Sequence, residues 1–190
     1  MPEQTHDFGQ YGAEGVKGSD LVARRLDDLA DFIATPITTS RGLTARLHYL
    51  TKSPRKLQAA RTAGLTVTDR TLKAWLAGTQ HPTKANLERI ETAYRTVRRH
   101  NIARHLIKRL NSSGGTRVEI HPLNQAQVQT PHQRVIEYRR VNVRHWENIV
   151  SAWATGDLRA LDDIWTTDVL PDLGSQWGQY EYVSNIGFAA

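Results

Sequence analysis

Apolar side chains recur three or four residues apart over most of the segment from residue 19 to residue 110, a spacing typical of amphipathic helices. Capping residues and glycines divide this pattern. Ser53-Pro54 precedes one apolar run, Thr68 precedes the next, and Gly78 follows it. The pattern therefore predicts successive helices over residues 19–35, 41–51, 54–63, 69–77 and 83–110.

The segment before these helices lacks a periodic apolar pattern. Residues 1–18 carry four glycines, and we expect them to form a flexible tail. The following stretch, residues 19–35, is rich in Asp and predicts an acidic amphipathic helix that Thr35-Pro36 ends. We expect its apolar face to dock on the basic segment that follows or to pair with another copy of the chain.

The hydrophobic period changes to two after the break at Asn111–Gly115. Alternation predicts a strand around Val118 and Ile120 and a second strand over residues 135–143. Two further helices are predicted around Gly156, and a last strand over residues 180–186. The fold class is therefore α+β. A helical helix-turn-helix domain over residues 41–110 is followed by a small α+β domain over residues 116–190.

Positive charge is concentrated in the helical segment. Residues 41–109 hold 16 Lys or Arg against 3 Asp or Glu, a net charge of +13, whereas residues 145–190 are net −6. A compact unit of such charge repels itself, and a polyphosphate relieves that repulsion while releasing its counterions. The charge therefore favours DNA as a partner.

Two short helices separated by Gly64 form a helix-turn-helix pattern over residues 53–78. The second helix keeps Leu72 and Trp75 for the core and leaves its N-terminal half to face outward, where such motifs read the major groove. Arg70 is the expected base reader and Lys73 a phosphate contact. The candidate DNA-binding residues are Arg55, Lys56, Arg61, Thr68, Asp69, Arg70, Thr71, Lys73, Lys84, Arg98 and Arg99.

Other functional classes find less support in the sequence. There is no cysteine, no HExxH motif and no P-loop, so neither a metal nor another cofactor is expected in the protein itself. No apolar run reaches the length of a membrane helix, and we expect a cytoplasmic, nucleoid-associated protein without a membrane partner. No catalytic constellation indicates an enzyme. A sequence-specific regulator that binds its operator as a homodimer remains an alternative.

The chain resembles the telomere terminal protein (Tpg) family of linear Streptomyces-type chromosomes and plasmids. The likeness rests, in order, on RLHYLTKSPRKLQAARTAGLTVTDRTLKAWLAG, HPTKANLERIETAYR, NSSGGTRVEIHP and QRVIEYRRVNV. The resemblance implies an actinobacterial protein that binds DNA ends and primes their replication. It also implies two partners, a telomere-binding protein and a DNA polymerase.

The resemblance further implies that a threonine hydroxyl becomes covalently joined to the 5′ nucleotide. The matching position is Thr130, before the polar stretch Pro131–Arg134. His132 is a candidate to assist the hydroxyl, although the divalent metals of the polymerase are a sufficient source of activation. Arg134 is a candidate to neutralise the new phosphate. Rival hydroxyls are those of Ser112, Ser113, Thr116 and Tyr138.

Overall fold

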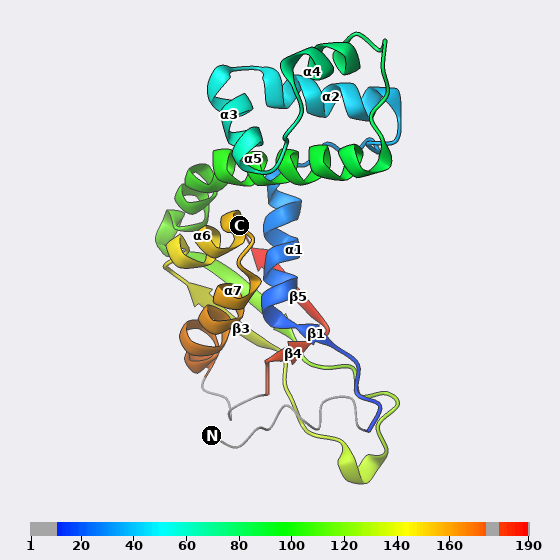
Figure 1. Ribbon diagram of the computed structural model, residues 1–190. Coiled ribbons are helices and arrows are strands. Elements are labelled where there is room, and N and C mark those ends of the chain that lie inside the picture. Colours follow the sequence, from blue (N-terminus) through cyan, green and yellow to red (C-terminus); the bar gives the residue numbers. More distant parts are fainter. Residues whose placement is uncertain (1–10, 174–178, 190) are drawn as a thin grey trace. The chain divides into compact units, whose positions relative to one another are not determined.

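The computed structural model describes residues 11–173 and 179–189 and has a mixed α+β fold (Figure 1). The chain divides into two compact units. We call residues 30–103 the helical unit. The mixed unit comprises the described residues of the two flanking segments, 11–29 and 104–189. In the described ranges no helix combines the length and apolar character that crossing a bilayer requires.

The helical unit contains four helices around one core. They are α2 (Ser40–Thr51), α3 (Pro54–Thr62), α4 (Asp69–Leu76) and the first part of α5 (Lys84–Leu110). Each helix contributes its apolar face, because burying that face against the others removes it from water. The fully buried members of this core are Leu47, Leu50, Ala60, Leu65, Ile90 and Ala93.

Local signals in the sequence set the ends of α3 and α4. The Ser53 hydroxyl accepts a hydrogen bond from the backbone N–H of Lys56 at 3.3 Å, and Thr68 does the same for Thr71 at 3.2 Å. Both are N-caps, which satisfy a donor that the first helical turn leaves free. Gly64, with a φ of +99°, follows α3 in the left-handed region that glycine adopts without steric cost. The expected bounds of these two helices are confirmed to within a residue.

The helical unit contains a buried arginine, Arg46, that bonds to several of its segments. The Arg46 side chain is 6% exposed, and its Nε lies 2.5 Å from a carboxylate oxygen of Glu91. Its Nη1 donates to the carbonyl oxygens of Thr35 and Gly42 at 2.8 and 3.0 Å, and its Nη2 donates to that of Ile33 at 3.0 Å. Arg46 therefore joins α2, α5 and the segment that enters the unit, rather than facing solvent.

The mixed unit is built on a three-stranded antiparallel sheet of order β3-β2-β5. Its strands are β2 (Thr116–His121), β3 (Arg139–Val143) and β5 (Asn185–Ala189). In the register of this sheet, Val118 is the partner of both Val141 and Phe188. A second, two-stranded sheet pairs β1 (Val16–Lys17) with β4 (Tyr182–Val183).

Besides the end of α5, the mixed unit contains the helices α1 (Gly18–Ala30), α6 (Glu147–Thr155) and α7 (Leu158–Ile164), and a π-helix, η4 (Trp165–Val169), continues α7. Side-chain hydrogen bonds join α1 to α6 and to β5. Trp153 Nε1 donates to Asp27 at 2.8 Å, and Arg25 Nε donates to the carbonyl oxygen of Ile186 at 2.6 Å. The second half of α1 is therefore tied to the C-terminal part of the chain.

Charged groups also meet where β1, α7 and β4 come together. The Lys17 ammonium lies 2.6 Å from the Asp162 carboxylate, and this hydrogen bond raises the pKa of Lys17. Ser19 donates to the other oxygen of Asp162 at 2.6 Å. Burial raises the pKa of the Glu181 carboxyl, and the nearby Asp162 raises it further. These contacts fix the first described residues against the end of the chain.

Four sequence predictions differ from the structure. The helix predicted to reach residue 35 ends at Ala30, because Asp31 has a φ of +51°. Of the predicted tail, residues 1–10 lie outside the described residues, while Glu14 bridges Asn124 and β1 pairs with β4. The strand predicted from residue 135 begins at Arg139, and the predicted last strand is divided between β4 and β5.

The predicted surface of the first helix also differs. Val22 and Leu26 are 3% and 0% exposed within this chain, so the apolar face of α1 is already covered. It does not offer the free surface that pairing with another copy requires. Residues 174–178 and 190 of the predicted C-terminal domain lie outside the described residues.

Candidate nucleic-acid interface

The N-terminal half of α4 exposes its polar side chains to solvent. Arg70 and Lys73 are exposed, as is Asp69, while Leu72 and Trp75 are 3% and 4% exposed and belong to the core. This division follows the sequence, because core positions three residues apart occupy one side of the helix. The outward side of α4 therefore carries two exposed cations, Arg70 and Lys73.

Contacts at the start of α4 hold it in place and engage several of the predicted DNA-binding residues. Arg61 forms an ion pair with Asp69 and donates to the carbonyl oxygen of Val67 at 2.6 Å. The hydroxyls of Thr68 and Thr71 lie 2.9 Å apart. Asp69, Arg61 and the two threonines therefore order the helix terminus, and each already has an internal contact.

Other predicted cations have no internal partner in the ranges that the structure describes. Arg55, Arg70, Lys73 and Lys84 are exposed and form no hydrogen bond or ion pair with those residues. Arg70 and Lys73 lie on α4, whereas Arg55 lies on α3 and Lys84 opens α5. A flexible exposed cation without a partner can bind a phosphate without breaking an existing contact.

The remaining predicted cations have internal roles. Arg98 donates to the carbonyl oxygens of Ala30 and Asp31 at 2.9 and 3.4 Å, which supplies donors where α1 ends. The Lys56 ammonium lies 3.7 Å from the ring centroid of Tyr49, within the range of a cation–π contact. Arg99 is half-buried and has a contact of its own. The sequence showed that these residues are charged, but it could not reveal their partners within the fold.

Thr130, the candidate nucleotide acceptor, lies in the mixed unit on the loop between β2 and β3. It is exposed at the first position of a short 3-10 helix, η3 (Thr130–His132), and its hydroxyl makes no hydrogen bond within the described part of the chain. The ring of His132 stacks on that of Tyr11, with centroids 4.1 Å apart. The backbone N–H and C=O of Arg134 each bond to the Gln125 side chain at 2.8 Å.

The rival hydroxyls are more restricted. Thr116 is 2% exposed and donates to the carbonyl oxygen of Leu110 at 2.7 Å. Ser112 donates to the carbonyl oxygen of Arg109 at 2.6 Å, and the Tyr138 hydroxyl accepts from Arg140 at 2.7 Å. Ser113 is exposed, with a φ of +56°. Thr130 and Ser113 are thus the freer hydroxyls of this set.

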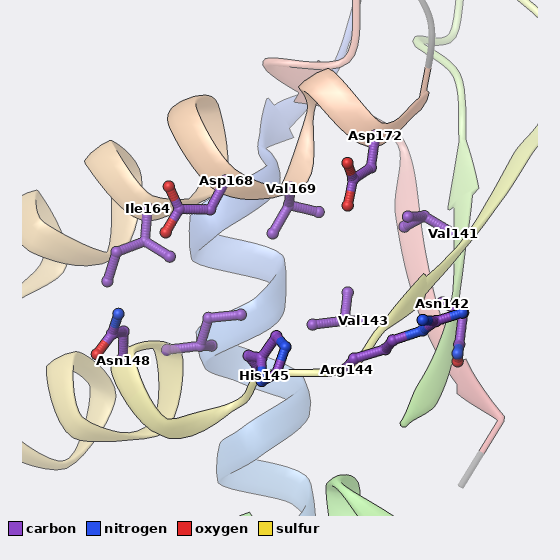
Figure 2. A pocket seen from close by; sticks show the side chains of 11 residues that line it. Val141, Asn142, Val143, Arg144, His145, Asn148, Ile164, Asp168, Val169 and Asp172 are labelled. Atoms are coloured by element: carbon purple, nitrogen blue, oxygen red, sulfur yellow. The ribbon is translucent and has the colours of Figure 1, made fainter. Parts of the chain in front are cut away.

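A cavity of about 540 Å³ in the mixed unit was not anticipated from the sequence. Figure 2 shows Asp168 and Asp172 on one side of it and Asn148 and His145 on the other. These residues come from two separate segments, 141–149 and 164–172, and no local motif in the sequence predicts that the fold brings them together. Arg144 also lines the cavity, so its wall carries both carboxylates and a cation.

In residues 11–173 and 179–189, no three His, Asp or Glu side chains come close enough together to hold a metal ion. Comparison of the chain with protein-family models, with curated proteins and with solved structures gave no match. The resemblance to the telomere terminal proteins therefore stays a prediction.

Proposed function

We propose that residues 53–78 form a helix-turn-helix and that the helical unit binds duplex DNA through it. In this proposal α4 enters the major groove, Arg70 reads a base edge and Lys73 contacts the sugar–phosphate backbone. One observation carries the proposal: α4 presents two exposed, unpartnered cations, Arg70 in its first turn and Lys73 in its last, while its other side is fixed in the core.

The position of the other exposed cations supports the same assignment. Arg55 lies in the first turn of α3 and Lys84 is the first residue of α5, so both lie near helix starts, where backbone N–H groups also favour anions. The internal ion pair between Arg61 and Asp69 fixes α4 before DNA arrives. A preordered recognition surface loses less conformational entropy on binding.

Arg70→Ala tests this assignment. A duplex selected from a random library with the full chain serves as the cognate site, and affinity is measured by fluorescence anisotropy on that site and on single-base variants. We expect a loss of about 1–3 kcal/mol on the cognate site and relaxed discrimination at one position. The matched control is Arg159→Ala, which removes an exposed arginine from α7 of the other unit.

Two results would contradict the assignment. Selection that enriches no duplex would reject sequence-specific binding. An equal loss on every sequence would show that Arg70 holds a phosphate and reads no base.

We further propose that the protein is a terminal protein of linear replicons, in which Thr130 accepts the first nucleotide. The Thr130 Oγ attacks the α-phosphorus of a deoxynucleoside triphosphate, a phosphoester forms and pyrophosphate leaves. The hydroxyl proton passes to a base of the partner polymerase or to water, and the polymerase supplies the divalent metal. The exposed, unbonded hydroxyl of Thr130 and the family resemblance support this proposal.

Nucleotide labelling tests the acceptor. The protein is incubated with a protein-primed DNA polymerase and a labelled deoxynucleoside triphosphate, and the adduct is located by mass spectrometry. We expect label on wild type and on Thr130→Ser, and none on Thr130→Ala. Equal label on Thr130→Ala would reject the site. No label on wild type, with duplex binding intact, would reject the terminal-protein proposal in favour of a regulator.

A further inference from the structure

A second cavity, of about 430 Å³, lies in the helical unit between α3 and α5. Its walls carry the basic side chains of Arg55, Lys56 and His100 and the amide of Asn101, and neither Asp nor Glu lines it. Ala63 and Val97 form part of an apolar floor. A cavity of this size, lined in this way, accommodates a small organic anion rather than a bare ion.

This cavity is separate from the exposed face of α4. The lining residues of α3 recur at positions 55, 56, 59, 62 and 63, which places them on one stripe of the helix. At roughly 100° per residue, Arg61 lies nearly opposite that stripe, and it is Arg61 that contacts Asp69 at the start of α4. A ligand in the cavity therefore leaves Arg70 and Lys73 accessible.

Tyr49 orders the polar groups of the cavity. Its ring holds the Lys56 ammonium at 3.7 Å from the centroid, and its hydroxyl accepts a hydrogen bond from Asn101 Nδ2 at 3.2 Å. The ring in turn packs edge-on against the buried Tyr94, with centroids 5.3 Å apart. Two of the cavity's polar side chains are thus positioned before any ligand binds, which lowers the entropic cost of binding.

His100 completes the basic wall. Its Nδ1 lies 3.3 Å from the carbonyl oxygen of Thr96, and since a carbonyl only accepts, Nδ1 carries the proton of this bond. Nε2 is left for a ligand. The Arg55 and Lys56 cations of α3 and the His100 imidazole of α5 therefore line one cavity in which a phosphoryl group can bind.

We propose that this cavity binds a nucleoside phosphate, with the phosphoryl group against Arg55, Lys56 and His100 and the apolar body on the floor formed by α3 and α5. Such a group can come from a free nucleotide or from a single strand of DNA, and both present the same chemistry. The inference goes beyond duplex recognition: Arg55 also belongs to the proposed duplex-binding set, but Lys56 and His100 do not, and no residue of α4 lines the cavity.

Calorimetry on the DNA-free full chain tests the proposal. The probes are thymidine 5′-monophosphate, thymidine, inorganic phosphate and a short single-stranded oligothymidylate. We expect saturable one-to-one binding of the monophosphate or the oligonucleotide, and at least about tenfold weaker binding of thymidine and of inorganic phosphate. Binding of the monophosphate assigns a free nucleotide as ligand, and binding of the oligonucleotide alone assigns a DNA strand.

Variants separate this site from the duplex-binding face. His100→Ala and Arg55→Ala change exposed side chains, so folding should persist, and each should weaken binding at least about fivefold. The matched controls are Lys84→Ala and Arg70→Ala, which lie outside the cavity and should bind the nucleotide as wild type does. Arg55→Ala should also weaken duplex binding, because Arg55 belongs to the proposed duplex-binding set, whereas His100→Ala should leave duplex binding unchanged. Only Arg70→Ala should lose duplex discrimination, so His100→Ala and Arg70→Ala together distinguish failure of one proposal from failure of the other.

Three results would overturn the proposal. The first is that no phosphate-bearing probe binds. The second is binding that His100→Ala and Arg55→Ala leave unchanged. The third is displacement of the bound nucleotide by an equal concentration of an acidic peptide such as hexaglutamate, which would make the cavity a general anionic docking surface.

Discussion

Among the basic side chains, Arg46 differs most from what its charge alone suggests. It belongs to the positive block of the sequence, yet it is buried and ion-paired with Glu91. A buried guanidinium needs a counter-ion and acceptors for its N–H groups, because desolvation of an unpaired charge costs several kcal/mol. Glu91 and three backbone carbonyls supply these partners.

Glu91→Ala should therefore destabilise the protein. Removal of the carboxylate leaves the buried Arg46 without its counter-ion, and we expect the free energy of unfolding to fall by about 2–3 kcal/mol. Urea unfolding followed by circular dichroism measures the change. The matched control is Glu88→Ala, an exposed glutamate on the same helix, which should change stability by no more than about 0.5 kcal/mol. Equal losses in the two variants would show that the ion pair contributes no stability.

The sequence could not distinguish exposed cations of the candidate interface from cations that have partners within the fold. Charge and helical spacing identified Arg70 and Lys73 as outward-facing, and the structure confirms their exposure. The spacing did not reveal that Arg61 pairs with Asp69 or that Arg98 donates to the carbonyl oxygen of Ala30. Those partners are 8 and 68 residues away in the chain, so they depend on the folded arrangement and not on a local pattern.

At the scale of elements, helices with local caps were predictable. Ser53 and Thr68 cap α3 and α4 with their own hydroxyls, and such bonds form within a single turn. The end of α1 was not predictable in this way, because the apolar period continues to Ile33. There the backbone N–H donates to the Tyr94 hydroxyl at 2.9 Å, a contact made from α5. Tertiary contacts therefore end the helix at Ala30 although the apolar spacing continues beyond it.

Short strands posed the corresponding difficulty in the mixed unit. β1 has only two residues, and its partner β4 lies at the other end of the sequence. Alternation over so few residues carries no signal, so the first described residues were expected to lie in a tail. The two cavities were missed for the same reason, since each is lined by elements distant in sequence that only the fold brings together.

At the scale of the whole molecule, charge is divided between the two units. The helical unit holds 13 Lys or Arg against 4 Asp or Glu, a net charge of +9. The described mixed unit holds 12 against 13, a net charge of −1. Binding of a polyphosphate should therefore depend on the helical unit and should weaken as salt screens it.

This charge division predicts the salt dependence of duplex binding. If Arg55, Arg70, Lys73 and Lys84 each neutralise one phosphate, the logarithm of the association constant should fall against the logarithm of salt concentration with a slope of about −3 to −4. Lys73→Ala should reduce that slope by about 1, because one fewer counterion is released. Fluorescence anisotropy between roughly 50 and 200 mM salt measures both slopes.

Arg61→Ala provides the internal comparison for this measurement. Arg61 carries the same type of charge as the exposed arginines, but its guanidinium already pairs with Asp69 and bonds to the carbonyl oxygen of Val67. Its removal should lower the affinity by loosening the start of α4 while leaving the slope within about 0.3 of wild type. A slope that falls by a full unit would instead place Arg61 on a phosphate, and a slope near zero in the wild-type protein would contradict electrostatic binding altogether.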